Sequence, residues 1–116
     1  MGYKLTGVDS ANETSWIRDR ILVLRPNIDQ YYGFWLDGVK NCTNSNSNCN
    51  NITWTDGYTT GNKALTGSNA LLSGINTSGK SENCLTVAKM GSGTVNDVVC
   101  AGSGSECGVV CGYQLM

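Results

Sequence analysis

The residues best suited to chemistry lie in the stretch 81–100. Glu82 precedes the first of two cysteines in this stretch, and Asn96 and Asp97 precede the second. Carboxylate and amide oxygens are the ligands that hard cations such as calcium prefer. The same residue types also serve turns, and their spacing matches no EF-hand loop. The pattern therefore leaves two interpretations open, a cation site and a set of turn residues.

A hairpin would bring these side chains together. Apolar residues at 85–88 and 95–99 predict two short strands, and the Gly-Ser-Gly sequence at 91–93 predicts the turn between them. The ends of this hairpin carry Cys84 and Cys100. A bridge between the two cysteines would lock the hairpin, at roughly 3 kcal/mol by the chain-entropy relation.

Several kinds of catalysis are excluded by composition. The chain of 116 residues contains no histidine, so a Ser-His-Asp or Cys-His nucleophile and the commonest zinc sites are excluded. Glycoside hydrolysis needs a carboxylate pair, and the spacing of the nine acidic residues proposes none. The sequence therefore predicts that the protein is not an enzyme.

Cysteine usage and sequons indicate an extracellular protein. Six cysteines without a Cys-x-x-Cys pair, in a chain long enough for one domain, favour a disulfide framework formed in an oxidising compartment. Four Asn-x-Ser/Thr sequons begin at Asn12, Asn41, Asn51 and Asn76. The sequence therefore predicts a secreted, disulfide-bonded glycoprotein, although any single sequon can arise by chance in an Asn-rich chain.

Charge and hydropathy argue against two classes of partner. The formal net charge is −1, and the eight Lys and Arg residues are scattered along the chain. Nucleic acids and anionic membranes attract clustered basic residues, so neither is an expected partner. No apolar run approaches the roughly 20 residues of a membrane span.

One helix is predicted over residues 10–25. Ser10 and Glu13 have the spacing of a capping box. Ile17, Ile21 and Leu24 recur at helical spacing, and the following proline ends the helix.

The remaining elements are predicted to be short strands and polar loops. We expect a buried aromatic strand over Tyr31–Val39 that runs into an Asp37-Gly38 turn. The other expected segments are a polar loop at 40–51 closed by a Cys42–Cys49 bridge, a short strand and turn at 52–57, a long irregular functional loop at 58–80 and a closing strand at 109–115.

Five short motifs, taken together, resemble the C-type lectin-like domain, particularly of secreted invertebrate lectins. In chain order they are Phe34-Trp-Leu-Asp-Gly38, Trp54-Thr-Asp-Gly57, Glu82-Asn-Cys-Leu-Thr-Val87, Val95-Asn-Asp-Val-Val-Cys100 and Val109-Val-Cys111. The resemblance covers nearly the whole chain and implies a single domain over 1–116, α+β in class, with small antiparallel sheets, one clear helix, a long polar loop and disulfide staples. It also implies that the family's first strands and first helix would precede Met1.

The resemblance implies a calcium site in which the ion binds the vicinal hydroxyls of a sugar. Residues that match the family's ligand positions, for both metal and sugar, are Asn76, Glu82, Asn96 and Asp97. Gly74 and Ile75 stand where the family has Glu or Gln followed by proline. The resemblance therefore implies a calcium site that is incomplete at Gly74.

The same resemblance assigns the cysteines in part. Cys84 and Cys100 match the family's inner bridge, whereas Cys111 matches a residue whose partner lies in the first helix. Cys107 is an alternative partner only if the chain turns at Gly108, because an extended strand holds the two Cα atoms farther apart than a disulfide allows. Otherwise a cysteine is free or bonded to another chain.

Two functions follow as expectations. The first is an extracellular carbohydrate-binding module for innate recognition, with glycans as partners and a loop calcium ion as cofactor. The alternative is a calcium-independent C-type lectin-like domain that serves protein–protein contact, adhesion or oligomer formation. In this alternative the retained acidic residues only complete the scaffold.

Overall fold

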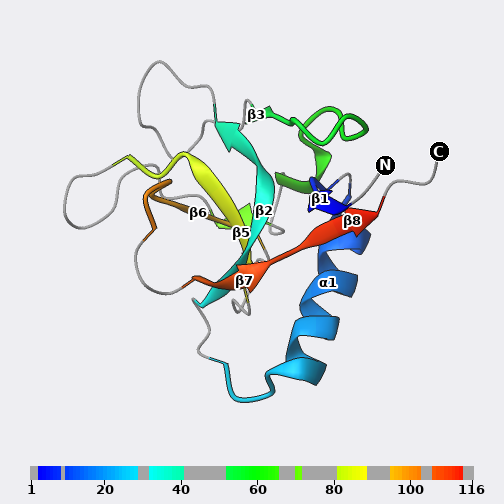
Figure 1. Cartoon of the computed structure of the whole chain (residues 1–116), viewed down its shortest axis with the longest axis vertical. Coiled ribbons are helices and arrows are strands. Elements are labelled where there is room, and N and C mark those ends of the chain that lie inside the picture. Colours follow the sequence, from blue (N-terminus) through cyan, green and yellow to red (C-terminus); the bar gives the residue numbers. More distant parts are fainter. Residues whose placement is uncertain are drawn as a thin grey trace.

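The computed structural model describes residues 3–8, 10–28, 32–40, 52–65, 70–71, 81–88, 95–102 and 106–113. These residues form a small α+β structure with one α-helix and a curled, mostly antiparallel sheet (Figure 1). They also contain a disulfide. The α+β class expected from the sequence is therefore confirmed. In chain order the elements are β1 (Tyr3–Leu5), α1 (Ala11–Leu24), β2 (Gly33–Lys40), β3 (Ile52–Thr53), the 3₁₀ turn η1 (Lys63–Leu65), β4 (Ala70–Leu71), β5 (Cys84–Ala88), β6 (Val95–Val98), β7 (Glu106–Val109) and β8 (Cys111–Tyr113).

Helix α1 begins where the sequence predicts. Ser10 has an extended backbone, and its hydroxyl accepts a hydrogen bond from the Glu13 N–H at 3.1 Å. This bond satisfies one of the amides that have no partner within the helix. The helix ends at Leu24, before Arg25 and Pro26. The helix predicted over 10–25 is confirmed.

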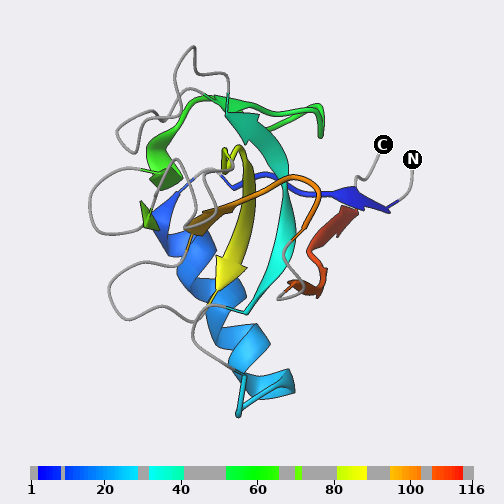
Figure 2. The same ribbon diagram turned by 90° about the vertical axis from the view of Figure 1, so that its left-hand side faces the viewer.

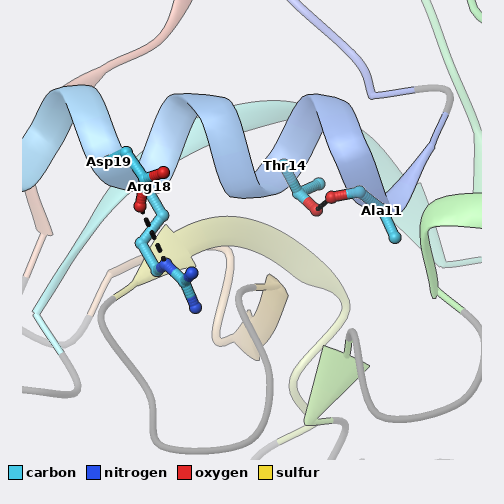
Figure 3. A network of polar contacts seen from close by, with 4 residues as sticks. All are labelled: Ala11, Thr14, Arg18 and Asp19. Atoms are coloured by element: carbon cyan, nitrogen blue, oxygen red, sulfur yellow. Dashed lines mark hydrogen bonds and ion pairs between the residues drawn. The ribbon is translucent and has the colours of Figure 1, made fainter.

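One face of α1 is buried against the rest of the structure. Thr14, Ile17 and Ile21 form this face, and Figure 2 shows the helix lying across one side of the sheet. The Thr14 hydroxyl donates to the Ala11 carbonyl at 2.8 Å (Figure 3), so its burial leaves no unsatisfied polar group. On the outer part of the helix, Arg18 Nε lies 3.7 Å from Asp19 Oδ1. A surface ion pair of this kind adds little stability.

Strand β2 is the centre of the larger sheet. The strand order is β3-β2-β5-β6-β4, with β7 also paired to β2. β2 and β5 are antiparallel, as are β5 and β6, whereas β7 runs parallel to β2. Strands β1 and β8 form a separate two-stranded sheet. The predicted pair of strands at 85–88 and 95–99 is confirmed as β5 and β6, and their turn at 91–93 lies outside the described residues.

The predicted Asp37-Gly38 turn is wrong. Both residues lie inside β2 and are buried, and the pairing of β2 with β5 is irregular between Trp35 and Val39. Gly38 has φ +118°, a region that side chains disfavour. A Cβ at Gly38 would lie 2.7 Å from the Trp54 ring. Asp37-Gly38 therefore forms a bulge, which lets the Trp54 ring approach the strand, and does not reverse the chain.

Three further predicted segments differ from the structure or lie outside the described residues. The closing strand expected at 109–115 is two strands, because Val110 interrupts it between β7 and β8. Val110 donates its N–H to the Trp35 carbonyl at 2.9 Å and accepts from the Thr6 N–H at 3.0 Å. The long loop expected at 58–80 contains η1 and β4. Cys42 and Cys49, and with them the predicted bridge, lie outside the described residues.

The hydrophobic core lies between α1 and the sheet. Leu85, Val87 and Val95 are fully buried on β5 and β6, and burying a side chain of this kind contributes about 1.5–3 kcal/mol. The other buried apolar residues of the cluster are Val8, Ile17, Ile21, Ile28, Leu36, Ala64 and Leu65. Among the described residues, no helix has the length and apolar character required to cross a membrane.

Candidate functional site

The β5–β6 hairpin and the residues just before it carry three of the four predicted ligand residues. Thr86 pairs with Asn96 and Leu85 pairs with Asp97, so the two polar residues follow one another on β6 and point to opposite faces. Asp97 is buried, and Asn96 is half-buried. Glu82 lies just before β5 and is also half-buried. Asn76, with Gly74 and Ile75, lies outside the described residues.

A disulfide joins the ends of the hairpin. Cys84 and Cys100 are bonded, with a Cα–Cα distance of 5.0 Å. The bridge predicted from the sequence is confirmed. It fixes the start of β5 relative to the segment that follows β6, and so fixes the backbone on which Glu82 and Asp97 stand.

The Asp97 carboxylate is held by a lysine that the sequence prediction did not include in the site. Lys40 Nζ is 2.6 Å from Asp97 Oδ2, and both side chains are almost completely buried, at 1% and 0% exposure. The Lys40 N–H donates to the Asn83 carbonyl at 2.8 Å, which holds the end of β2 against the residue next to Glu82. The site therefore contains its own cation, the Lys40 ammonium.

The prediction of a polar loop over 40–51 is wrong at its first residue. Lys40 ends β2, and it is buried whereas its neighbour Val39 is exposed, which places the Lys40 side chain on the inner face of the strand. No local sequence signal identifies the buried lysine, because the apolar residue beside it, Val39, is the exposed one, and because Asp37-Gly38 has the composition of a turn.

Glu82 is the third ionisable side chain of the cluster. Burial raises the pKa of its carboxyl above the ordinary 4.5, and the negative charge of Asp97 raises it further, while the positive charge of Lys40 partly opposes both effects. A carboxyl group in this position binds its proton more tightly in the folded state. Its contribution to stability therefore falls as the pH rises from 4.5 through the folded-state pKa.

We expect the Glu82 carboxyl to titrate with a midpoint above 4.5 in an NMR titration that follows its side-chain carboxyl carbon. Asp97→Asn is the matched variant, because it removes the repelling charge and keeps the lysine. In that variant the midpoint should fall relative to the native protein. A native midpoint at or below 4.5 would contradict the described cluster.

The chemistry available to this cluster is limited by the ion pair. Asp97 already accepts the Lys40 ammonium, so one of its oxygens is committed to a cation. Among the residues that the structure describes, no three acidic, His or Cys side chains gather as a metal-binding group. A calcium ion at this position would need Asn76, from the segment outside the described residues, and would compete with Lys40 for Asp97.

A second polar cluster surrounds two carboxylates that the sequence assigned only to turns. Asp56 is buried and accepts hydrogen bonds from the N–H groups of Gly7 at 2.7 Å, Tyr58 at 3.0 Å and Thr59 at 2.9 Å, and from the Thr59 hydroxyl. Burial alone would raise the pKa of Asp56, but these hydrogen bonds outweigh it and hold the pKa below 3.8.

Asp37 supports the same turn from β2. It accepts from the Thr55 N–H at 2.5 Å, the Thr55 hydroxyl at 2.6 Å and the Asp56 N–H at 3.0 Å. Nearly every described contact of these two carboxylates is to the backbone or to a neighbouring threonine. The second cluster is therefore structural, and the Trp54-Thr-Asp-Gly57 motif marks a turn that two carboxylates organise.

An apolar groove of about 290 Å³ lies between α1 and the strands that close the chain. Trp16, Leu24 and Val109 at this groove are 65%, 73% and 53% exposed. The remaining lining residues are Ile17, Arg20, Ile21, Phe34, Val110 and Cys111. Exposed apolar side chains that are gathered in this way are typical of surfaces that contact another protein.

Cys111 is an exposed free thiol on the rim of this groove. The bridge to Cys107 that the sequence left open is absent, and Gly108 lies within extended strand β7. The turn that such a bridge would need is therefore not formed.

Comparison of the chain with protein-family models, with curated proteins and with solved structures found no match.

Proposed function

We propose that the protein is an extracellular binding module with a C-type lectin-like fold, which contacts a partner protein without calcium. The observation that carries the proposal is the buried pair of Lys40 and Asp97. In this pair an ammonium group already neutralises the Asp97 carboxylate, which a calcium ion would need as a ligand. The acidic residue then serves the scaffold, as the calcium-independent alternative requires.

The surface available for such a contact is the apolar groove beside α1. Its lining is dominated by aliphatic and aromatic side chains, with Arg20 as its charged member. Sugars are bound mainly through hydrogen bonds to their hydroxyl groups, whereas an apolar segment of a protein gains from burying this kind of surface. The groove therefore favours a protein partner that presents apolar side chains.

Calcium-mediated glycan binding is the second candidate. It is favoured by two carboxyl groups near Lys40, those of Asp97 on β6 and of Glu82 just before β5, whereas Asn96 points to the other face of β6. These residue types supply the oxygen ligands that calcium prefers. In this alternative, calcium would displace the lysine from Asp97 and recruit Asn76.

Calorimetric titration with calcium separates the two candidates. Extracellular modules bind calcium with dissociation constants of about 10⁻⁴–10⁻³ M, so the titration should extend to about 10 mM. We expect no binding heat from the native protein and the same glycan-array signal with and without a chelator. Calcium heat together with chelator-sensitive glycan binding would overturn the proposal in favour of the second candidate.

Lys40→Gln is the matched variant for this experiment. It removes the ammonium and leaves Asp97, Glu82 and Asn96 in place. If the lysine is what excludes calcium, the melting temperature of the variant should rise with added calcium, because a ligand that binds the folded state stabilises it. The native protein should show no such rise. A rise in the native protein that equals that of the variant would contradict the assigned role of Lys40.

A further inference from the structure

The geometry points to an intramolecular amide bond between Lys40 and Asp97, formed by condensation of the lysine amine with the aspartate carboxyl group after the chain has folded. This modification goes beyond the proposed binding function. It would join the end of β2 to β6 covalently, across β5, which lies between them in the sheet.

The two groups already lie in contact. Nζ is 2.6 Å from Asp97 Oδ2, so the amine nitrogen lies directly beside the carboxyl group that it would attack. Among the described residues, Asp97 is the one hydrogen-bond acceptor in contact with Nζ. The backbone holds both residues in place. The Lys40 N–H donates a hydrogen bond to the Asn83 carbonyl, and Asp97 pairs with Leu85 in the sheet. Fixed partners of this kind react as if each were present at a very high concentration.

The site also favours the product over the reactants. An ion pair that is almost completely buried carries a large desolvation cost, and a neutral amide that replaces it carries much less. Water is excluded from the two side chains, so hydrolysis of the amide is disfavoured once the released water has left. Leu85, which pairs with Asp97 across the two strands, is apolar and fully buried.

The reaction is balanced without an oxidant, a reductant or a further reactant. Transfer of one proton across the 2.6 Å contact converts the ion pair into an amine and a carboxylic acid. The lone pair of Nζ then forms a bond to Cγ, and the bond between Cγ and one carboxyl oxygen breaks. That oxygen leaves as water with its own proton and one proton from Nζ.

The intact mass of the reduced, folded chain tests the inference. Expression in a bacterial host avoids glycans at the four sequons. We expect a mass lower than that of the sequence by one water molecule, and a tryptic map in which Lys40 is uncut and joined to the peptide that contains Asp97. A folded native protein with the full mass of its sequence would overturn the inference.

Two Asp-Gly pairs require a control, because succinimide formation at Asp37-Gly38 or Asp56-Gly57 also releases one water. Lys40→Arg keeps a positive charge but cannot form the amide, so we expect this variant to have its full mass. Hydroxylamine opens a succinimide and leaves an amide intact. A water loss that persists in Lys40→Arg, or that hydroxylamine abolishes, would overturn the assignment.

Discussion

Replacing Asp56 by alanine is expected to lower the free energy of unfolding by about 3–5 kcal/mol, close to the largest effects that single substitutions produce. The Asp56 carboxylate accepts hydrogen bonds from three backbone amides and a hydroxyl. Alanine would leave these donors without a partner in a buried site. Each buried donor that loses its partner costs about 1–3 kcal/mol, and relaxation of the turn would recover part of that cost.

Urea unfolding followed by tryptophan fluorescence measures the loss. Asp19→Ala is the matched control, because Asp19 is an aspartate with a mostly exposed side chain and should change stability by less than about 0.5 kcal/mol. Asp56→Asn should give an intermediate loss of stability. The asparagine keeps one acceptor oxygen, but its NH₂ group would face the N–H and hydroxyl donors that bind the Asp56 carboxylate. A loss below 1 kcal/mol in Asp56→Ala would contradict the described network.

The stabilising effect of Asp56 should also depend on pH. Its pKa is lowered in the folded state from the ordinary 3.8. A carboxyl of this kind contributes stability that is fully present above 3.8 and is lost as the pH falls through the folded-state pKa. The stability difference between the native protein and Asp56→Asn should therefore shrink when unfolding is measured below that pH.

Replacing Lys40 by methionine alone should lower the free energy of unfolding by about 3–5 kcal/mol, because it leaves the Asp97 carboxylate buried without its counter-charge. The double variant Lys40→Met/Asp97→Leu removes both charges. For an ion pair, its stability should return close to that of the native protein, since apolar residues of similar volume often replace a buried pair without loss. Urea unfolding of the four proteins gives the coupling between the two residues.

The same cycle distinguishes an ion pair from an amide. The two residues are separated by 57 positions, and a covalent link across such a separation constrains the unfolded chain by about 4 kcal/mol in the chain-entropy relation. With the amide present in the native protein, the double variant should remain less stable by about that amount. Full recovery in the double variant would therefore contradict the cross-link.

Local signals in the sequence were sufficient for α1 and for the β5–β6 hairpin. The helix is fixed by its cap at Ser10, by apolar residues at helical spacing and by Pro26. The hairpin is fixed by two apolar runs on either side of the Gly-Ser-Gly sequence at 91–93, and its cysteines lie at the two ends. In both cases the residues that determine the structure lie within about 20 positions of one another.

The rest depended on distant partners. Asp37-Gly38 reads as a turn by composition, and only the Trp54 ring and the pairing of β2 with β5 explain why it is a bulge. Lys40 lies beside an Asn-rich stretch, and its burial follows from Asp97, which is far away in the sequence. For this reason the sequence identified Glu82, Asn96 and Asp97 as an oxygen cluster and missed the cation that accompanies them.

The hydrogen bonds to Asp56 also determine how the segment after β3 opens to solvent. The amides of Gly7, Tyr58 and Thr59 lie outside the regular strands, yet each donates to a carboxylate that sits on the same turn. That turn is itself held to β2 through Asp37. Exchange of these three amides with deuterium therefore requires the turn to separate from β2. We expect them to exchange at the rate of the sheet amides, as part of one cooperative unit, and not at the faster rate of a surface loop.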